Sequence, residues 1–226
     1  MRASKLFSVL LILIFCAPAW GGSPKVLHRF AKQHRAMHWI VSENAPDSAA
    51  GCTATAIGPH ALLTAQHCEL DDNGRPLLFF VDPIEKPDYL TAETPYKIVG
   101  VMHDGSDHAI FMLSGPAFKD IAPVEFAAPQ QGENVLWFGN PGGIRDQLRE
   151  GYVMGVQPAP VPEQQYQQPM WMVDAPAIPG DSGSAVLDAN TGAIVGVVTY
   201  GINDGEFMGM FALHFSAAQM AAAEAW

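Results

Sequence analysis

Short apolar runs separated by turn sequences extend through most of this chain, and helical periodicity is weak. Apolar runs of this length that end at Gly, Pro, Asn or Asp predict β-strands. Turn pairs such as Asn73-Gly74 and Asp204-Gly205 supply residues that tolerate positive φ. The predicted strands are residues 37–42, 53–57, 61–64, 77–81, 96–102, 109–113, 134–138, 151–156, 171–174, 184–187, 193–199 and 208–213. Many strands without a repeat or βαβ alternation predict an all-β barrel or sandwich.

Two segments depart from the strand pattern. Residues 157–170 are rich in Pro and Gln, and their four prolines would obstruct a β-ladder, so we expect a long surface loop there. Ser216 is a favourable N-cap residue, and strong helix formers follow it in residues 217–226. The chain should therefore end in a short helix.

The amino terminus has the layout of a secretory signal peptide. Two basic residues precede the apolar run 6–15, and the small-residue segment 17–19 follows it. This run is too short to span a bilayer, so we expect cleavage after Ala19, a secreted or periplasmic protein, and no stable membrane insertion afterwards. A lipoprotein signal acylated at Cys16 is the alternative. The bulky Phe15 just before that cysteine argues against it.

Composition and charge predict a globular protein and argue against nucleic-acid binding. The 226 residues are 49% hydrophobic and 15% charged, which predicts a globular protein. Loss of the signal leaves 10 basic residues against 23 acidic ones, a net charge of −13. This surface gives no counterion-release drive toward phosphate, so nucleic acid is not an expected partner. Its expected role is solubility. We expect a monomer and no cofactor.

The cysteine count favours a disulfide over a metal site. If Cys16 leaves with the signal, Cys52 and Cys68 remain, and an even count in an exported protein points to a crosslink. A loop of about 15 residues would contribute roughly 3 kcal/mol in the chain-entropy model. His34 and His38 could bind zinc if helical, but no Glu follows His34 to make His-Glu-x-x-His. We therefore expect exposed side chains and no metal.

Ser182 is the candidate nucleophile. It lies in the segment 179–186, Pro-Gly-Asp-Ser-Gly-Ser-Ala-Val, where small residues let the backbone approach a ligand. The N–H groups of Gly180 and Ser182 are spaced to supply the two donors of an oxyanion hole. An ordinary hairpin turn is the alternative interpretation. The nucleophile elbow of α/β-hydrolases is excluded by Ser184, which stands where that motif needs its last glycine.

A serine hydroxyl needs a base, and the base needs a carboxylate to orient it. His67 is the best-positioned histidine because it precedes Cys68 directly and follows an apolar strand. Asp107 is the candidate carboxylate because it leads into the apolar run 109–113 and should be buried at the start of that strand. Asp104 is the second choice. Asp107 could instead cap a local turn with Ser106.

Together these residues resemble the chymotrypsin-like serine peptidases. His67, Asp107 and Ser182 follow that family's chain order, and Gly-Asp-Ser-Gly matches its serine motif. The segment Thr-Ala-Gln-His-Cys before and through Cys68 looks like its Thr-Ala-Ala-His-Cys, and Asp-His-Ala-Ile from Asp107 is similar to its Asp-Ile-Ala-Leu.

The resemblance covers residues 37–215 and implies two six-stranded antiparallel β-barrels with the triad in the cleft between them. The expected organisation is a signal peptide (1–19), an N-terminal segment that is a candidate propeptide (20–36), a first barrel with His67 and Asp107 (37–125), and a second barrel with Ser182 and the C-terminal helix (126–226).

Residues 135–143 also look like the bacterial branch, including HtrA-type proteases. HtrA proteins have Asn where Asp181 stands, and no room remains for a PDZ domain, so the resemblance favours a compact bacterial or phage-type enzyme. Zymogen members pair the acid before the serine with a freed Ile-Val amino terminus. The pair at 40–41 lies too close to Cys52 for that role, so Asp181 has no recognisable partner. The need for maturation stays open, with a cut after Arg29 or Arg35 as the alternative.

The resemblance implies a secreted serine endopeptidase. The residues that would line its primary pocket by position are Pro176, Ala177, Thr199, Tyr200, Gly201, Gly209 and Phe211. They include no carboxylate, which disfavours Arg or Lys substrates, and Val198 replaces the histidine of glutamyl peptidases. We therefore expect cleavage after an apolar or small residue of a polypeptide substrate. The alternatives are a catalytically silent binding protein on the same fold and an esterase that uses the same site.

Overall fold

The computed structural model describes residues 24–42, 51–69, 78–82, 84–86, 89–91, 96–124, 127–157, 169–203, 207–212 and 214–226. The predicted signal peptide and residues 158–168 of the predicted proline-rich loop lie outside these ranges. No helix among the described residues is both long and apolar enough to cross a membrane.

Strands make up most of the structure. In chain order the elements are α2 (Pro24–Ala36), β1 (Met37–Ser42), β2 (Cys52–Gly58), β3 (Ala61–Ala65), the 3₁₀ turn η2 (Gln66–Cys68), β4 (Leu78–Val81), β5 (Ile84–Lys86), β6 (Tyr89–Thr91), β7 (Tyr96–His103), β8 (His108–Ser114), β9 (Asn134–Gly139), the 3₁₀ turn η3 (Pro141–Gly143), β10 (Gln147–Gln157), β11 (Met170–Val173), β12 (Ala185–Asp188), β13 (Ile194–Asn203), β14 (Phe207–Ala212) and α3 (Ala217–Ala225).

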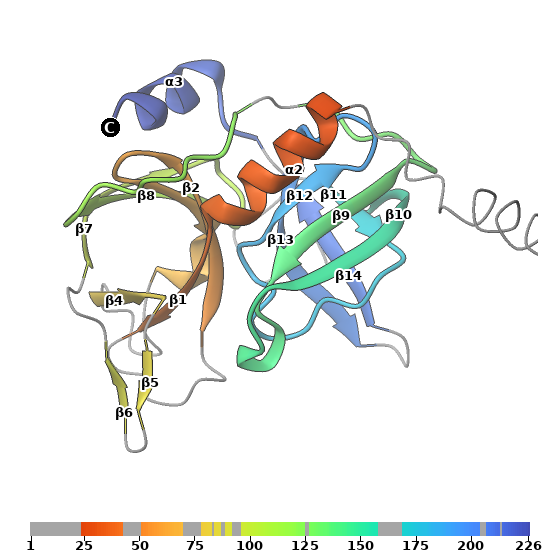
Figure 1. Cartoon of the computed structure of the whole chain (residues 1–226). Coiled ribbons are helices and arrows are strands. Elements are labelled where there is room, and N and C mark those ends of the chain that lie inside the picture. The colour runs from red at the N-terminus through yellow and green to blue at the C-terminus, as the bar shows by residue number, and fades with distance from the viewer. Residues whose placement is uncertain are drawn as a thin grey trace, which may run out of the picture.

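The strands form two closed antiparallel barrels of six strands each. The first has the order β1-β2-β3-β8-β7-β4 and the second the order β10-β11-β14-β13-β12-β9. Figure 1 shows the two barrels side by side, the first in orange to yellow-green and the second in green to blue. The predicted fold is confirmed, and each predicted strand is present. The β5–β6 hairpin and helix α2 were not predicted.

Strand ends are where the prediction was least accurate. Strand β10 begins at Gln147, four residues before the predicted start, because its first part is polar and exposed while it still pairs with β9. Hydrophobic patterning does not detect a strand segment whose partly buried position carries a charged residue such as Arg149. The early start matters because it brings Arg149 into the sheet opposite Trp137.

Helix α3 confirms the predicted C-terminal helix. The Ser216 hydroxyl accepts the Gln219 N–H, and the Gln219 side chain accepts the Ser216 N–H, which is a complete capping box. Although α3 follows the second barrel in sequence, it packs on the first (Figure 1). A Cβ at Gly58 of β2 would lie 2.1 Å from the Ala223 carbonyl oxygen, so glycine is required for this close approach.

Helix α2 contacts both halves of the molecule (Figure 1). Its buried Gln33 donates to the Pro123 carbonyl in the segment between the barrels, at 3.3 Å. Its Arg29 donates to the Thr191 carbonyl in the turn before β13, also at 3.3 Å. The segment predicted to be a candidate propeptide therefore includes a helix that packs against both barrels.

Candidate active site

The candidate base is held at the end of a strand in the first barrel. Strand β3 runs into η2, which carries His67 in its single turn. The imidazole Nδ1 lies 2.7 Å from Asp107 Oδ2, and the backbone N–H of His67 donates to Asp107 Oδ1 at 3.0 Å. One carboxylate thus holds both the ring and the backbone of this histidine, which fixes the ring's orientation.

The pairing of β3 with β8 brings Asp107 to this position. These strands are antiparallel with Ala65 opposite His108, so the end of β3 lies beside the start of β8. The Gln66 N–H donates to the Asp107 carbonyl at 3.0 Å and continues the ladder past the strand ends. Asp107 is fully buried, whereas the His67 side chain is 41% exposed. The carboxylate is shielded from water while the ring remains accessible.

Asp104, the second choice for the carboxylate, binds a different histidine. Its Oδ2 lies 2.7 Å from His108 Nδ1 and accepts the His214 N–H, while its Oδ1 accepts the Ser106 N–H. Burial alone would raise the pKa of Asp104, but the hydrogen bond and charge of His108 and these two N–H donors outweigh burial and lower the pKa below its ordinary value. Asp104 ties β8 to the segment before α3.

The buried Asp104–His108 pair should make the free energy of unfolding depend on pH. A carboxyl whose pKa is lowered by folding stabilises the native state above its unfolded-state pKa, and this contribution is lost as pH falls through the folded-state value. The loss of stability begins as the pH approaches 3.8, the ordinary pKa of an Asp carboxyl. Asp104→Asn should therefore lose less free energy of unfolding than the wild type between about pH 6 and pH 3. Urea unfolding at both pH values measures this difference, and equal losses would contradict it.

The candidate nucleophile lies in the loop between β11 and β12. The four carbonyls from Pro179 to Ser182 each accept a hydrogen bond, in order from Gly142 N–H, the Thr53 hydroxyl, Ser184 N–H and Thr53 N–H, at 2.7–3.0 Å. The N–H groups of Gly180 and Ser182 have no acceptor in the part of the chain that the structure describes. Unpaired N–H donors of this kind are what an oxyanion hole requires, and the predicted hole at Gly180 and Ser182 stays a prediction.

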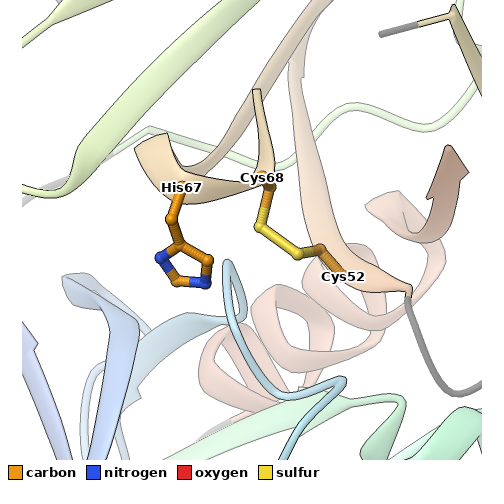
Figure 2. Close-up of side chains that lie close together, drawn as sticks. All are labelled: Cys52, His67 and Cys68. Atoms are coloured by element: carbon orange, nitrogen blue, oxygen red, sulfur yellow. A yellow bond between two sulfur atoms is a disulfide. The ribbon is translucent and has the colours of Figure 1, made fainter. Parts of the chain in front are cut away.

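The loop is pressed against the first barrel beside the strand that leads to His67. A Cβ at Gly183 would lie 2.0 Å from the Thr53 carbonyl oxygen and 2.2 Å from Thr64 Oγ1, and the φ of this residue is +86°. Only glycine fits there. Figure 2 shows a pale blue loop of the second barrel beside the His67 ring. The Ser182 side chain is half-buried. A hydrogen bond between a catalytic serine and its base often tightens only when substrate binds.

The predicted disulfide between Cys52 and Cys68 is present. Figure 2 shows it beside the His67 ring, and the two sulfurs and a ring nitrogen lie within 4.8 Å of one another. A metal would need two thiolates, and the crosslink consumes both. The disulfide instead joins the residue before Thr53, which holds the nucleophile loop, to the residue after His67. It therefore links strand β2, which holds the nucleophile loop through Thr53, to the turn η2, which carries His67.

Loss of this crosslink should weaken the fold. Cys52→Ala/Cys68→Ala is expected to lower the free energy of unfolding by about 3 kcal/mol, because the crosslink constrains the unfolded chain. Equilibrium urea unfolding measures the difference. A thiol reductant should destabilise the wild type by a similar amount and leave the double variant unchanged. An effect of reductant on the variant, or none on the wild type, would contradict this account.

The residues predicted for the primary pocket lie in the second barrel. Gly201 of β13 pairs with Gly209 of β14, and Tyr200 pairs with Met210. Ala177 and Phe211 belong to the barrel's core cluster. Thr199 is buried and its hydroxyl has no hydrogen-bond partner, while Pro176 is exposed.

Sequence reasoning missed three residues of this region. Thr53 holds the carbonyls of Gly180 and Ser182, Asn140 donates its side-chain amide to Thr53 Oγ1 at 2.9 Å, and Arg149 lies 3.8 Å from the Asp181 carboxylate. The position of Thr53 next to a disulfide cysteine was the only local signal. The others contact the site through barrel closure, which leaves no trace in the neighbouring sequence.

Comparisons with known proteins show the same fold. The Rv3671c protease from M. tuberculosis in its active form has a TM-score of 0.60 and 20% identity, over 89% of this chain and 86% of that one. The inactive form of the Rv3671c protease has a TM-score of 0.59 and 18% identity, over 89% of this chain and 94% of that one. The HtrA-type protease AlgW with tripeptide has a TM-score of 0.63 and 18% identity, over 88% of this chain and 62% of that one. No curated protein sequence matches. Residues 52–197 match the trypsin-like peptidase domain. Since this match spans more than half of the chain, the protein belongs to the trypsin-like serine peptidase family.

Proposed function

We propose that the protein is a serine endopeptidase in which Ser182 attacks the substrate carbonyl. His67 takes the hydroxyl proton and later gives it to the leaving amine, while Asp107 holds the ring and stabilises its cation. The observation that carries the proposal is the pair of hydrogen bonds from His67 to one buried carboxylate, at 2.7 and 3.0 Å. They leave Nε2 as the ring atom that can receive a proton.

The backbone donors of Gly180 and Ser182 would stabilise the oxyanion of the tetrahedral intermediate. Two observations support this role. All four carbonyls from Pro179 to Ser182 accept hydrogen bonds, and the N–H groups of Gly180 and Ser182 have no acceptors among the described residues. Donors that are already oriented need no reorganisation when charge develops on the substrate oxygen. The proposed site thus combines a nucleophile, a base, an orienting acid and an oxyanion hole.

A fluorophosphonate probe tests the mechanism directly, because it reacts with a serine activated by a base and not with ordinary hydroxyls. The purified protein should be labelled once, and peptide mapping should find the adduct on Ser182. Labelling should stop when His67 is replaced by Ala. A folded wild-type protein that resists the probe would refute the proposed activity.

We also propose a preference for an apolar or small residue before the scissile bond. The predicted pocket residues include no carboxylate, and Ala177 and Phe211 lie in an apolar cluster, so nothing there would compensate a buried substrate cation. A peptide library read by mass spectrometry should show cleavage after residues such as Ala, Val, Leu or Phe. Predominant cleavage after Arg, Lys or Glu would overturn this assignment.

Export from the cytoplasm is part of the same proposal. The disulfide supports it, because such crosslinks persist in oxidising compartments. Expression with the full N-terminal segment should yield an exported protein whose first residue is Trp20. A product retained in the cytoplasm with its first 19 residues intact would contradict the assignment.

A further inference from the structure

The acid before the nucleophile is buried with little local compensation. Asp181 is fully buried, and its neighbours Gly180 and Ser182 carry the two oxyanion donors. Its Oδ2 accepts the Ile178 N–H at 3.2 Å, whereas its Oδ1 has no hydrogen-bond partner. An ionised carboxylate in this position needs a nearby positive charge.

Arg149 supplies a positive charge from the neighbouring strand. It lies opposite Trp137 in the β9–β10 ladder, and its Nε is 3.8 Å from Asp181 Oδ2. That nitrogen is buried and has no hydrogen-bond partner of its own. Arg149 is the one basic side chain that forms an ion pair with Asp181 within the described part of the molecule. By contrast, the Arg35–Asp120 pair is half exposed on both sides and should contribute little.

The position of this carboxylate determines the shape of the nucleophile loop. Asp181 closes a turn on each side, since its N–H donates to Ile178 and its carbonyl accepts from Ser184. Its Oδ1 lies against the backbone of Gly139, where a Cβ would be only 2.2 Å away. The Gly139 backbone therefore leaves the carboxylate no space on that side. If it turned toward water, it would carry the flanking N–H groups with it.

The Ile-Val pair at residues 40–41 cannot supply a freed amino terminus as the counter-charge. The one Ile-Val pair near the expected position, residues 40–41, lies in the middle of β1 and is buried. Ile40 pairs with Cys52 on one side and with Val81 on the other. A cut before Ile40 would divide a strand of the first barrel and would not release a mobile end.

We propose that Arg149 is a positioning residue for the oxyanion hole: its guanidinium holds the Asp181 carboxylate in the barrel, so that the loop is active without a freed amino terminus. This inference rests on the proposed peptidase activity and deepens it. Arg149 does not touch the reacting atoms and acts through Asp181.

Burial disfavours the ionised form of Asp181, so that form depends on the charge and donors around it. Burial raises the pKa of Asp181 above its ordinary value, while the Ile178 N–H, the Arg149 charge and the Trp137 side chain only partly oppose that rise. Without Arg149 the carboxyl would either take up a proton or leave the barrel for water. In either case the contact that holds the loop would change.

Arg149→Met is the first test. It removes the charge and keeps an apolar stem, and kcat on a peptide substrate should fall by on the order of 10²-fold while KM changes little, since the lost interaction belongs to the transition state. Arg149→Lys should recover most of the activity. Asp181→Asn added to Arg149→Met should also recover activity, because it removes the uncompensated charge. Arg35→Met is the matched control and should retain wild-type kcat.

The amino terminus gives the second test. The mature wild-type protein with its α-amino group acetylated should keep its kcat/KM, whereas an enzyme that depends on an N-terminal ammonium would lose it. The inference is overturned if Arg149→Met keeps wild-type kcat, or if acetylation inactivates the enzyme. If Arg149→Met does not fold, Arg149→Lys is compared with Arg35→Met instead. The inference is also overturned if Arg149→Lys is less active than Arg35→Met by about 10²-fold or more. Failure of the proposed activity itself is distinct, because the wild type would then neither cleave peptides nor react with the fluorophosphonate.

Discussion

Ser182→Ala should abolish peptide hydrolysis and leave the fold intact, with kcat/KM reduced on the order of 10⁵-fold. The substitution removes only the hydroxyl. The backbone carbonyl of Ser182 would still accept the Thr53 N–H at 2.8 Å, and the Gly183 N–H would still donate to Val198 at 2.7 Å. Burst kinetics with an ester substrate and labelling by the fluorophosphonate should both disappear.

Ser184→Ala is the matched control for this result. Ser184 lies two positions further along, and its buried hydroxyl has no hydrogen-bond partner. Removal of an unsatisfied buried hydroxyl should be neutral or stabilising, so this variant should keep nearly full activity. If Ser182→Ala retained more than about a hundredth of wild-type activity, or lost its circular dichroism spectrum, the assignment of Ser182 as nucleophile would be wrong.

Asp107→Asn should lower kcat on the order of 10⁴-fold at neutral pH, with a small effect on KM. Asp107 accepts the His67 backbone N–H with one oxygen and binds Nδ1 with the other. An amide has a single oxygen, so it cannot accept from both groups. The ring would then adopt the wrong tautomer or orientation, and Nε2 could no longer take the proton from Ser182.

Asp104→Asn provides the comparison for this variant. Asp104 and His108 form a second buried pair with the same 2.7 Å separation, and Asp104, three residues before Asp107, binds His108 where Asp107 binds His67. Asp104→Asn should therefore affect stability and spare kcat. Steady-state kinetics of both variants across pH test the distinction. Equal loss of kcat in the two would mean that the whole start of β8 acts as one structural unit and that Asp107 has no special role.

Many features of the site follow from local sequence. The Gly-Asp-Ser-Gly motif contains glycine at Gly183, where a Cβ would lie 2.0 Å from the Thr53 carbonyl oxygen. The cysteines were assigned to each other by their number, and the disulfide is present. The strand pattern predicted all twelve barrel strands because each contains a short apolar run. These are properties of short segments, which depend mainly on neighbouring residues.

Other features could not be predicted because they depend on how distant strands pair. Arg149 appeared to be an ordinary charged residue, and its relation to Asp181 arises from the β9–β10 ladder and the return of the loop before β12. Thr53 became the clamp of the nucleophile loop only when the second barrel packed on the first. Helix α2 was missed because apolar residues in it are few and its packing surface is shared between the barrels.

The sequence by itself determined the positions of the strands, the glycines that the nucleophile loop requires, and the cysteines available for a crosslink. The tertiary structure decided which carboxylate binds His67. Asp104 and Asp107 are three residues apart, and nothing in the local pattern separates them conclusively. The antiparallel register of β3 and β8, with Ala65 opposite His108, brings Asp107 to the histidine and turns Asp104 toward His108. A register is a property of two strands distant in sequence, so only the folded barrel determines the pairing.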